Sequence, residues 1–292
     1  MSTFRSAVAA YEKKCIEADV PSETVMCYLV ELSQQERYAL YMNFENEMPE
    51  ALQKKFDEGM ARILSQEPMG HVLGYSWFYG YKFIVNENVL IPREETEELC
   101  AQILARMDRI FTEQDSIECA DVGTGSADIA ITLCKEEKKV RMHATDISEE
   151  ALTVARQNAV NNEADIDFMA GDMLKPLIER NIKLDVLACN PPYIPAEEKM
   201  EHSVVDYEPH VALFGGDDGL KFYRQVFRDC RQIMKPKSFM AFEMGYDQRE
   251  RMSVLVQEML PDTSFEILKD MNGKDRMLFV YFGCSSINDM ND

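Results

Sequence analysis

The spacing of apolar residues in the first quarter of the chain is helical. Up to about residue 75 the sequence is rich in Glu, Lys, Gln, Leu, Ala and Met, and apolar residues recur every three or four positions, as at Val25, Tyr28, Leu29 and Leu32. Such a period places the apolar side chains on one face of each helix. The pattern predicts a small helical domain of four or five helices over residues 1–75.

The next stretch is aromatic and β-branched instead of helical. Its sequence, YSWFYGYKFIVNENVLIP, carries Gly80 between two aromatic runs. Aromatic and β-branched runs separated by a glycine are typical of a β-hairpin. We therefore assign residues 76–95 to a β-hairpin linker. The following REETEELCAQILARM has its apolar residues on one face and predicts a helix.

After about residue 115, short apolar segments alternate with helical patterns. Seven of these segments predict strands, namely IECADV, RMHATDI, IDFMAGD, LDVLACN, SFMAFEMG, FEIL and RMLFVYF. Helices are predicted between them, for example over residues 149–161 and 220–234. Short apolar strands that alternate with helices indicate a parallel sheet covered on both faces. We expect one α/β domain over residues 96–284, with the last two strands antiparallel at an edge.

Composition narrows the classes of partner. The 292 residues are 46% hydrophobic and carry a formal net charge of -21. Proteins that bind phosphate backbones usually present a basic face. The acidic balance therefore disfavours a direct nucleic-acid partner.

The cysteines and the apolar runs indicate the compartment. Eight cysteines are scattered without a CxxC pair, as in reduced cytosolic proteins. The first residues lack the apolar core of a signal peptide, and no apolar run approaches the roughly 20 residues of a membrane helix. We expect a cytoplasmic protein with no membrane partner. It is expected to be a monomer, because no heptad pattern is present.

No metal site is expected. The four histidines, His71, His143, His202 and His210, do not cluster with acidic residues at the spacing of metal ligands. His143 falls inside a predicted strand and is interpreted as structural. Cys189 precedes an asparagine in a buried strand and is interpreted as a packing residue.

The segment ADVGTGSADIAITL places a glycine-rich turn between a predicted strand and a helix. Glycine lets the backbone approach a ligand closely, and the helix N-terminus offers free N–H groups. The fragment G-T-G-S-A departs from the dinucleotide fingerprint G-x-G-x-x-G. A tight turn without any ligand remains an equal alternative for this fragment alone.

Acidic residues end the next two predicted strands. Asp146 ends the second strand, where a carboxylate can accept both hydrogens of a ribose diol. Its alternative role is a helix N-cap, and Ser148 is an equally suitable cap. Asp172 and Met173 follow the third strand and suit an adenine amino group and ring, although each taken alone is more typical of an ordinary loop residue. Taken together, the three strand ends predict a nucleoside-binding crevice.

The fourth strand ends in Asn190, Pro191, Pro192 and Tyr193. Proline fixes φ and so holds the neighbouring carbonyl groups rigidly. The asparagine oxygen and a backbone carbonyl could accept the two hydrogens of a planar NH2 group, while the tyrosine ring lies against its plane. Carbonyl dipoles would stabilise the positive charge that forms when this nitrogen is alkylated. A purely structural turn is the alternative.

In this order, GTGS, TDIS and NPPY resemble the class I S-adenosylmethionine-dependent methyltransferases that modify amino nitrogens. GHVLGYSWFYGYKFIVNENVLIPREETEEL and YEPHVALFGGDDGL resemble the peptide chain release factor glutamine methyltransferases, PrmC/HemK, over nearly the whole chain. The resemblance implies a Rossmann-like domain with a seven-stranded, mostly parallel sheet, preceded by a helical substrate-recognition domain.

The activity implied is transfer of a methyl group from S-adenosyl-L-methionine to N5 of the glutamine in the Gly-Gly-Gln motif of class I release factors. The cofactor-binding residues implied are Gly123, Thr124, Gly125, Ser126, Ala127, Asp146, Met173 and Asn190. The substrate amide would be held by Asn190, Pro191, Pro192 and Tyr193, with Asn190, Pro191 and Tyr193 as the catalytic residues.

Two positions depart from the pattern of this family. Glu94 stands where the family usually has proline, which is expected to loosen the start of the following helix. Ala127 stands where a third glycine is common, and its Cβ disfavours a positive φ. We expect an altered cofactor fit without loss of binding.

Three further expectations follow from the sequence. The long charged loop between Pro195 and Gly219 is expected to form a wall of the glutamine pocket and to become ordered when substrate binds. An N6-adenine nucleic-acid methyltransferase is the alternative enzyme, because it shares the crevice and NPPY. A noncatalytic module that senses cofactor or release factor is the alternative of another class.

Overall fold

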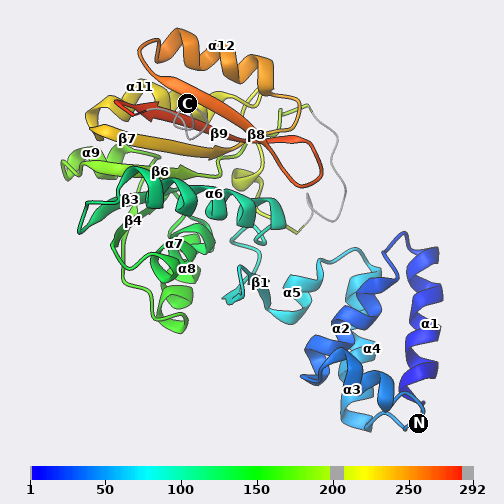
Figure 1. The fold of residues 1–292 in the computed structure, drawn as a ribbon. Coiled ribbons are helices and arrows are strands. Elements are labelled where there is room, and N and C mark those ends of the chain that lie inside the picture. The colour runs from blue at the N-terminus through cyan, green and yellow to red at the C-terminus, as the bar shows by residue number, and fades with distance from the viewer. Residues whose placement is uncertain (1, 198–206, 285–292) are drawn as a thin grey trace. The chain divides into compact units, whose positions relative to one another are not determined.

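The computed structural model describes residues 2–197 and 207–284. These residues form two compact units, one up to Tyr75 and one from Ser76 onward, with Tyr207 grouped with the first. Figure 1 shows the elements of both units in chain order. Within the described ranges, none of the helices combines the length and apolar character that crossing a membrane requires.

The first unit is helical. Its helices are α1 (Phe4–Glu17), α2 (Glu23–Ser33), α3 (Arg37–Met42), α4 (Glu50–Leu64) and α5 (Met69–Leu73). Thr3 caps α1, because its side chain accepts a hydrogen bond from the backbone N–H of Ser6. The apolar faces of α1, α2 and α4 share one buried cluster that includes Leu29 and Phe56. The helical spacing read from the sequence thus reflects burial of one face of each helix.

A two-stranded hairpin, β1 (Tyr75–Phe78) and β2 (Tyr81–Ile84), precedes the α/β elements. Gly80 turns the hairpin with φ of 79°, a conformation that glycine adopts without steric cost. The helices of the second unit are α6 (Glu94–Ile110), α7 (Asp128–Glu136), α8 (Glu149–Asn161), α9 (Lys175–Glu179), α11 (Lys221–Asp229) and α12 (Arg249–Met259). Its strands are β3 (Ile117–Val122), β4 (Val140–Asp146), β5 (Ile166–Ala170), β6 (Leu184–Cys189), β7 (Met234–Glu243), β8 (Ser264–Lys269) and β9 (Asp275–Phe282).

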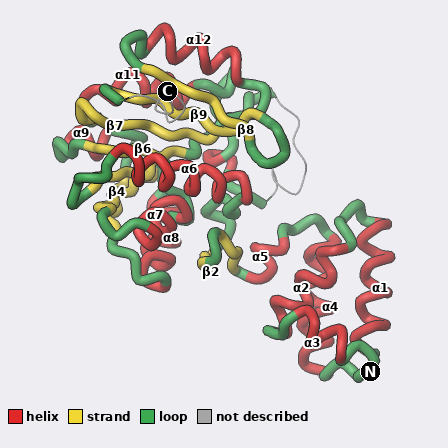
Figure 2. Tube along the Cα trace, in the orientation of Figure 1, coloured by secondary structure: helices red, strands yellow, loops and turns green. Residues whose placement is uncertain are grey.

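The seven strands of the second unit form one sheet in the order β5-β4-β3-β6-β7-β9-β8. The pairs among β5, β4, β3, β6 and β7 are parallel, and β9 runs antiparallel to β7 and β8. The predicted mostly parallel, seven-stranded sheet is therefore confirmed. Figure 2 shows the strands as one layer between helices.

Alternate residues of each strand face opposite sides of this sheet. Cys119 and Val186 pack in the apolar cluster that contains residues of α6, α7 and α8. Their chain neighbours Ala120 and Leu187 pack in the cluster that contains residues of α9, α11 and α12. The two helical layers lie on opposite faces of the sheet in Figure 1. Burial on both faces explains why these strands read as continuous apolar runs.

Several boundaries differ by one or two residues from the sequence-based expectation, and two differ by more. The helix predicted over residues 220–234 ends earlier, since α11 stops at Asp229 and a 3-10 turn, Cys230–Gln232, leads directly into β7. β7 also begins before the predicted segment. It includes Pro236, and its pairing with β6 shifts register between Leu184 and Val186. A proline without an N–H donor is tolerated at such an irregularity, although it hides the strand from sequence analysis.

Candidate active site

A cavity of about 310 Å³ lies within the second unit at the carboxyl ends of its parallel strands. The strand-end segments that line it come from β3, β4, β5 and β6, as expected for a ligand site of an open α/β sheet. Its lining residues are Asn88, Val89, Leu90, Gly123, Thr124, Gly125, Ser126, Asp128, Ile129, Asp146, Ile147, Ser148, Ala151, Gly171, Asp172, Met173, Asn190, Pro192, Pro209, Val211, Ala212, Lys221, Phe222 and Gln225.

The glycine-rich turn after β3 is held by the neighbouring strand. The backbone N–H groups of Gly123 and Thr124 donate to the carbonyl of Thr145 at 2.8 and 2.9 Å. Gly123 and Gly125 have φ of 75° and 52°, so the turn uses a conformation that glycine adopts readily. Ala127 lies behind the turn, buried at the start of α7 and outside the cavity lining.

Asp146 closes the same turn from the end of β4. Its Oδ2 accepts the backbone N–H of Gly125 at 2.9 Å, and its Oδ1 accepts the N–H of Ser148 at 2.9 Å. The cap of α8 is Ser148, whose hydroxyl accepts the N–H of Ala151. Burial raises the pKa of Asp146, against the effect of these N–H donors. Each carboxylate oxygen keeps a lone pair for a further donor.

The segment after β5 contributes a backbone feature and a side-chain pair. Met173 lines the cavity with φ of 48°, and its carbonyl accepts the hydroxyl of Thr145 at 3.0 Å. Asp172, also in the lining, accepts a hydrogen bond from Gln225 of α11 at 2.8 Å. The strand-end residues predicted for the nucleoside crevice therefore lie around one cavity.

The NPPY segment follows β6. Asn190 and Pro192 line the cavity, whereas Pro191 is buried and absent from the lining. The side-chain nitrogen of Asn190 donates to the hydroxyl oxygen of Thr96 at 3.3 Å. Tyr193 is directed toward the interior, where its hydroxyl donates to Oε1 of Glu243 at 3.1 Å. Its predicted packing against a substrate amide remains a prediction.

Several site residues were missed by the sequence analysis. Asp128 follows the glycine-rich turn directly and lines the cavity, and burial raises its pKa to about 7. Glu243 is the last residue of β7, but the predicted strand SFMAFEMG continued to Gly245 and hid this position. Thr96 gave no local signal, because its partners are distant in sequence.

Asp121 lies beneath the turn as a second buried carboxyl group. Its Oδ2 accepts the hydroxyl of Thr124 at 2.6 Å, while its Oδ1 has no hydrogen-bond partner among the described residues. Burial, together with the nearby charge of Asp128, raises the pKa of Asp121 to about 7. Two buried carboxyl groups with raised pKa values, Asp121 and Asp128, therefore flank the glycine-rich turn.

The loop predicted to form a pocket wall is described only in part. Residues 198–206, which include His202, lie outside the described residues. Pro209, Val211 and Ala212 line the cavity. Glu208 is 3% exposed and forms an ion pair with Arg93 at 2.6 Å. Arg93 directly precedes α6, which begins at Glu94.

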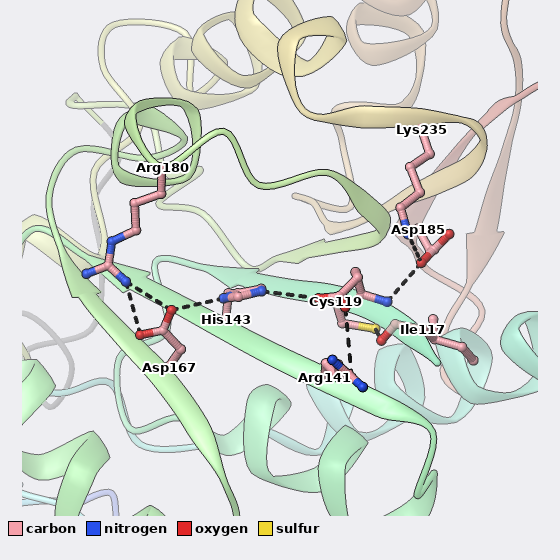
Figure 3. Close-up of polar contacts among 9 residues, drawn as sticks. Ile117, Cys119, Arg141, His143, Asp167, Arg180, Asp185 and Lys235 are labelled. Carbon is pink, nitrogen blue, oxygen red and sulfur yellow. Dashed lines mark hydrogen bonds and ion pairs between the residues drawn. The ribbon is translucent and has the colours of Figure 1, made fainter. Parts of the chain in front are cut away.

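His143 belongs to a polar network in the sheet and not to the cavity (Figure 3). Its ring nitrogens lie 3.2 Å from Asp167 and 3.3 Å from Glu118. Arg180 pairs with Asp167, and Lys235 pairs with Asp185. The network ties the strands together toward their amino ends, in keeping with a structural role for His143.

Comparisons with known proteins agree with this architecture. The family model of the methyltransferase small domain matches residues 100–207, and that of the PrmC N-terminal domain matches residues 7–74. The release factor glutamine methyltransferase of Bacillus cereus is 40% identical over 259 residues, which cover 88% of this chain and 90% of the relative. That of Bacillus subtilis is 42% identical over 213 residues, covering 72% and 74%.

The chain belongs to the release factor glutamine methyltransferase family. Membership confirms the resemblance carried by the GTGS, TDIS and NPPY motifs, and makes the chain a methyltransferase. A solved methyltransferase from Pyrococcus furiosus shares the fold, with a TM-score of 0.52 and 16% identity, over 78% of this chain and 98% of that chain.

Proposed function

We propose that this chain transfers a methyl group from S-adenosyl-L-methionine to the side-chain amide nitrogen (N5) of the glutamine in the Gly-Gly-Gln motif of class I peptide chain release factors. Family membership supports this reading over N6-adenine methylation. The structural observation that carries it is the placement of Asn190, which lines the cavity and whose NH2 group donates a hydrogen bond to Thr96. Its Oδ1 is then the end available to a substrate amide.

The residues of the cavity fit the proposed cofactor. A Cβ added at Gly123 or Gly125 would meet no atom within 4 Å, so the turn borders open space. The charged lining residues are three aspartates and one lysine, Asp128, Asp146, Asp172 and Lys221. An acidic lining suits a ligand that carries an ammonium and a sulfonium group.

The proposed roles follow from this fit. Gly123, Thr124, Gly125 and Ser126 would hold the methionine part, with Ala127 supporting the turn from behind. Asp146 would bind the ribose hydroxyls, and Met173 would contact the adenine. When bound, S-adenosylmethionine supplies an electrophilic methyl group on its sulfonium.

The substrate nitrogen needs positioning more than activation by a base. An amide nitrogen is a weak nucleophile because its lone pair is delocalised into the carbonyl. We infer that Asn190 Oδ1 and the Pro191 carbonyl accept the two NH2 hydrogens, while Pro192 and Tyr193 confine the amide. This fixes the nitrogen toward the methyl group, and such positioning lowers the barrier substantially. The methylated nitrogen then loses one proton to water, which requires no dedicated base.

The acceptor protein is recognised, in this proposal, with the help of the helical first unit. Because the acceptor acts in translation termination, we expect the enzyme to work in the cytoplasm. We also expect it to act as a monomer, without membrane or nucleic-acid partners.

The proposal is tested by mapping the product. Purified protein is incubated with S-adenosylmethionine and an unmodified class I release factor, and the peptides are analysed by mass spectrometry. One added methyl group is expected on the Gly-Gly-Gln glutamine. Asn190→Ala should lower turnover roughly 10²- to 10³-fold, the usual effect of removing one oriented polar group from an active site.

The matched control is Asn161→Ala, which truncates an exposed asparagine at the end of α8. It should retain full turnover. Cofactor binding without methylation of the release factor would contradict the proposed acceptor. Near-normal turnover of Asn190→Ala would contradict the proposed site.

A further inference from the structure

Three side chains from separate elements form a hydrogen-bonded chain behind the cavity. Thr96, in the first turn of α6, donates its hydroxyl to Oε2 of Glu243 at 2.6 Å. Asn190 donates its side-chain NH2 to the oxygen of the same hydroxyl at 3.3 Å. Thr96 is 1% exposed and Glu243 is 2% exposed. Water therefore does not compete for these contacts.

The order of donors and acceptors in this series of hydrogen bonds determines which way the Asn190 amide points. An ionised carboxylate only accepts hydrogen bonds, and a hydroxyl has a single hydrogen to donate. Once Thr96 donates to Glu243, its oxygen can only accept. The end of Asn190 that meets Thr96 must therefore be the NH2 group, and the carbonyl oxygen is left for the cavity. This reasoning fixes an assignment that amide oxygen and nitrogen positions alone leave ambiguous.

The same carboxylate also holds the other end of the NPPY segment. The hydroxyl of Tyr193 donates to Oε1 of Glu243, so each carboxylate oxygen accepts one side-chain hydroxyl. The backbone carbonyl of Glu243 accepts the buried hydroxyl of Tyr223 at 2.7 Å. Glu243 is therefore held by its backbone carbonyl and by one hydroxyl donor on each carboxylate oxygen, and it anchors both Asn190, through Thr96, and Tyr193.

We propose that Thr96 and Glu243 are positioning residues for methyl transfer, which orient the Asn190 amide so that its Oδ1 faces the substrate nitrogen. The inference rests on the proposed function, because it assigns the orientation its purpose there. A purely structural role, in which the same contacts only attach α6 to the sheet, is the competing explanation.

The chemical consequence of losing the pair is specific. If Thr96 no longer accepts, Asn190 can rotate and present NH2 hydrogens toward the NH2 group of the substrate. Two NH2 groups, both hydrogen-bond donors, then face one another, and the substrate NH2 group loses Asn190 Oδ1 as its acceptor. Catalysis should fall, while cofactor binding through the glycine-rich turn and Asp146 persists.

The first test compares Thr96→Val, which keeps the shape but removes the hydroxyl, with Thr96→Ser, which restores it. With release factor as substrate, Thr96→Val should lower kcat at least about 10-fold, a loss typical of misplaced catalytic groups. The dissociation constant for S-adenosylmethionine should change less than about 2-fold, and Thr96→Ser should recover activity to within about 3-fold of wild type.

The decisive kinetic comparison uses Asn190→Ala. Because Thr96 acts through Asn190, adding Thr96→Val to Asn190→Ala should cause no further loss of kcat, whereas independent effects would multiply. Multiplying losses would overturn the proposal. Thr132→Val is the matched control, since Thr132 is buried in α7 and its hydroxyl has no partner among the described residues.

A second measurement reads the orientation of Asn190 without turnover. In protein with ¹⁵N-labelled asparagine, the side-chain NH2 protons of Asn190 should exchange slowly in wild type and Thr96→Ser. They should exchange faster in Thr96→Val and Glu243→Gln. Unchanged exchange in Thr96→Val overturns the inference, whether or not the wild-type protein methylates a release factor. Absent methylation with the expected exchange pattern contradicts only the proposed substrate.

Discussion

At the scale of single residues, the glycine-rich turn departs most from expectation. Ala127 was expected to avoid a positive φ, yet it adopts φ of 64° at the start of α7. The reason is local hydrogen bonding, because its N–H donates to the carbonyl of Thr124 at 2.7 Å within the same turn. A left-handed alanine costs roughly 1–2 kcal/mol. The turn geometry that places Gly125 against Asp146 therefore outweighs the preference of one residue.

Asp128 leads to a prediction about the pH dependence of cofactor binding. Burial raises the pKa of Asp128 to about 7 in the ligand-free protein. Below that pH its carboxyl group is protonated, so a cationic ligand that favours the ionised form must displace a proton. Affinity for S-adenosylmethionine should therefore fall as pH decreases from 8 to 6, by up to about 10-fold per unit.

The measurement is calorimetric titration with S-adenosylmethionine across this pH range in wild type and Asp128→Asn. The variant should lose much of the pH dependence. Asp172→Asn removes an equal charge from an exposed position of the same cavity lining and should leave the dependence intact. Equal slopes in wild type and Asp128→Asn would rule out Asp128 as the titrating group.

At the scale of elements, the packing of α2 on α4 depends on a glycine. Gly59 is buried on α4, and a Cβ at this position would overlap the hydroxyl and ring of Tyr28 on α2. The Tyr28 ring stacks on Phe56 of α4, with centroids 5.9 Å apart. A small residue is therefore required for the two helices to approach this closely.

Gly59→Ala should lower the stability of these helices by about 1–3 kcal/mol through overpacking, although alanine favours a helix by about 1 kcal/mol. Hydrogen exchange of α2 and α4 amides, followed by mass spectrometry, measures this opening free energy. The double variant Gly59→Ala/Tyr28→Leu should lose less stability than the sum of the losses of the two single variants.

The control for this prediction lies in the same helix. Ala61→Gly, at an exposed position of α4, reports the intrinsic helix preference without a packing change. If Gly59→Ala instead stabilised α4 by as much as Ala61→Gly destabilises it, steric overlap with Tyr28 would be excluded as the dominant effect.

The elements themselves were largely predictable, and the exceptions have causes in the sheet. α8 over Glu149–Asn161 matches the predicted residues, because Ser148 supplies a local cap signal. α11 was predicted too long, because apolar residues at its end and at the start of β7 look continuous along the sequence. Only pairing with β6 shows that Met234 already belongs to a strand.

At the scale of the whole molecule, the charge of -21 opposes binding to nucleic acid. Phosphate contacts provide most nonspecific affinity for nucleic acid, and these contacts come from lysine and arginine. The cavity lining is also negatively charged on balance, since among the described residues it contains three aspartates and a single cationic residue, Lys221.

The protein should accordingly pass through a heparin column at about 0.15 M salt, the regime in which phosphate-binding proteins are retained. A basic protein on the same column provides the control for its capacity. Gel-shift titration with duplex DNA and with RNA should show no salt-dependent complex. Retention on heparin together with such a complex would restore the N6-adenine methyltransferase alternative.

The sequence by itself determined the α/β class, the strands and the order of the strand-end motifs, because these depend on local periodicity and turn chemistry. The tertiary structure decided which distant residues meet at the site. Thr96 and Glu243 are separated by 147 positions, yet share a hydrogen bond behind Asn190. That contact exists because the strand order places the ends of β6 and β7 side by side beneath the start of α6. Local patterns carry no information about such an arrangement, since each element is compatible with several neighbours.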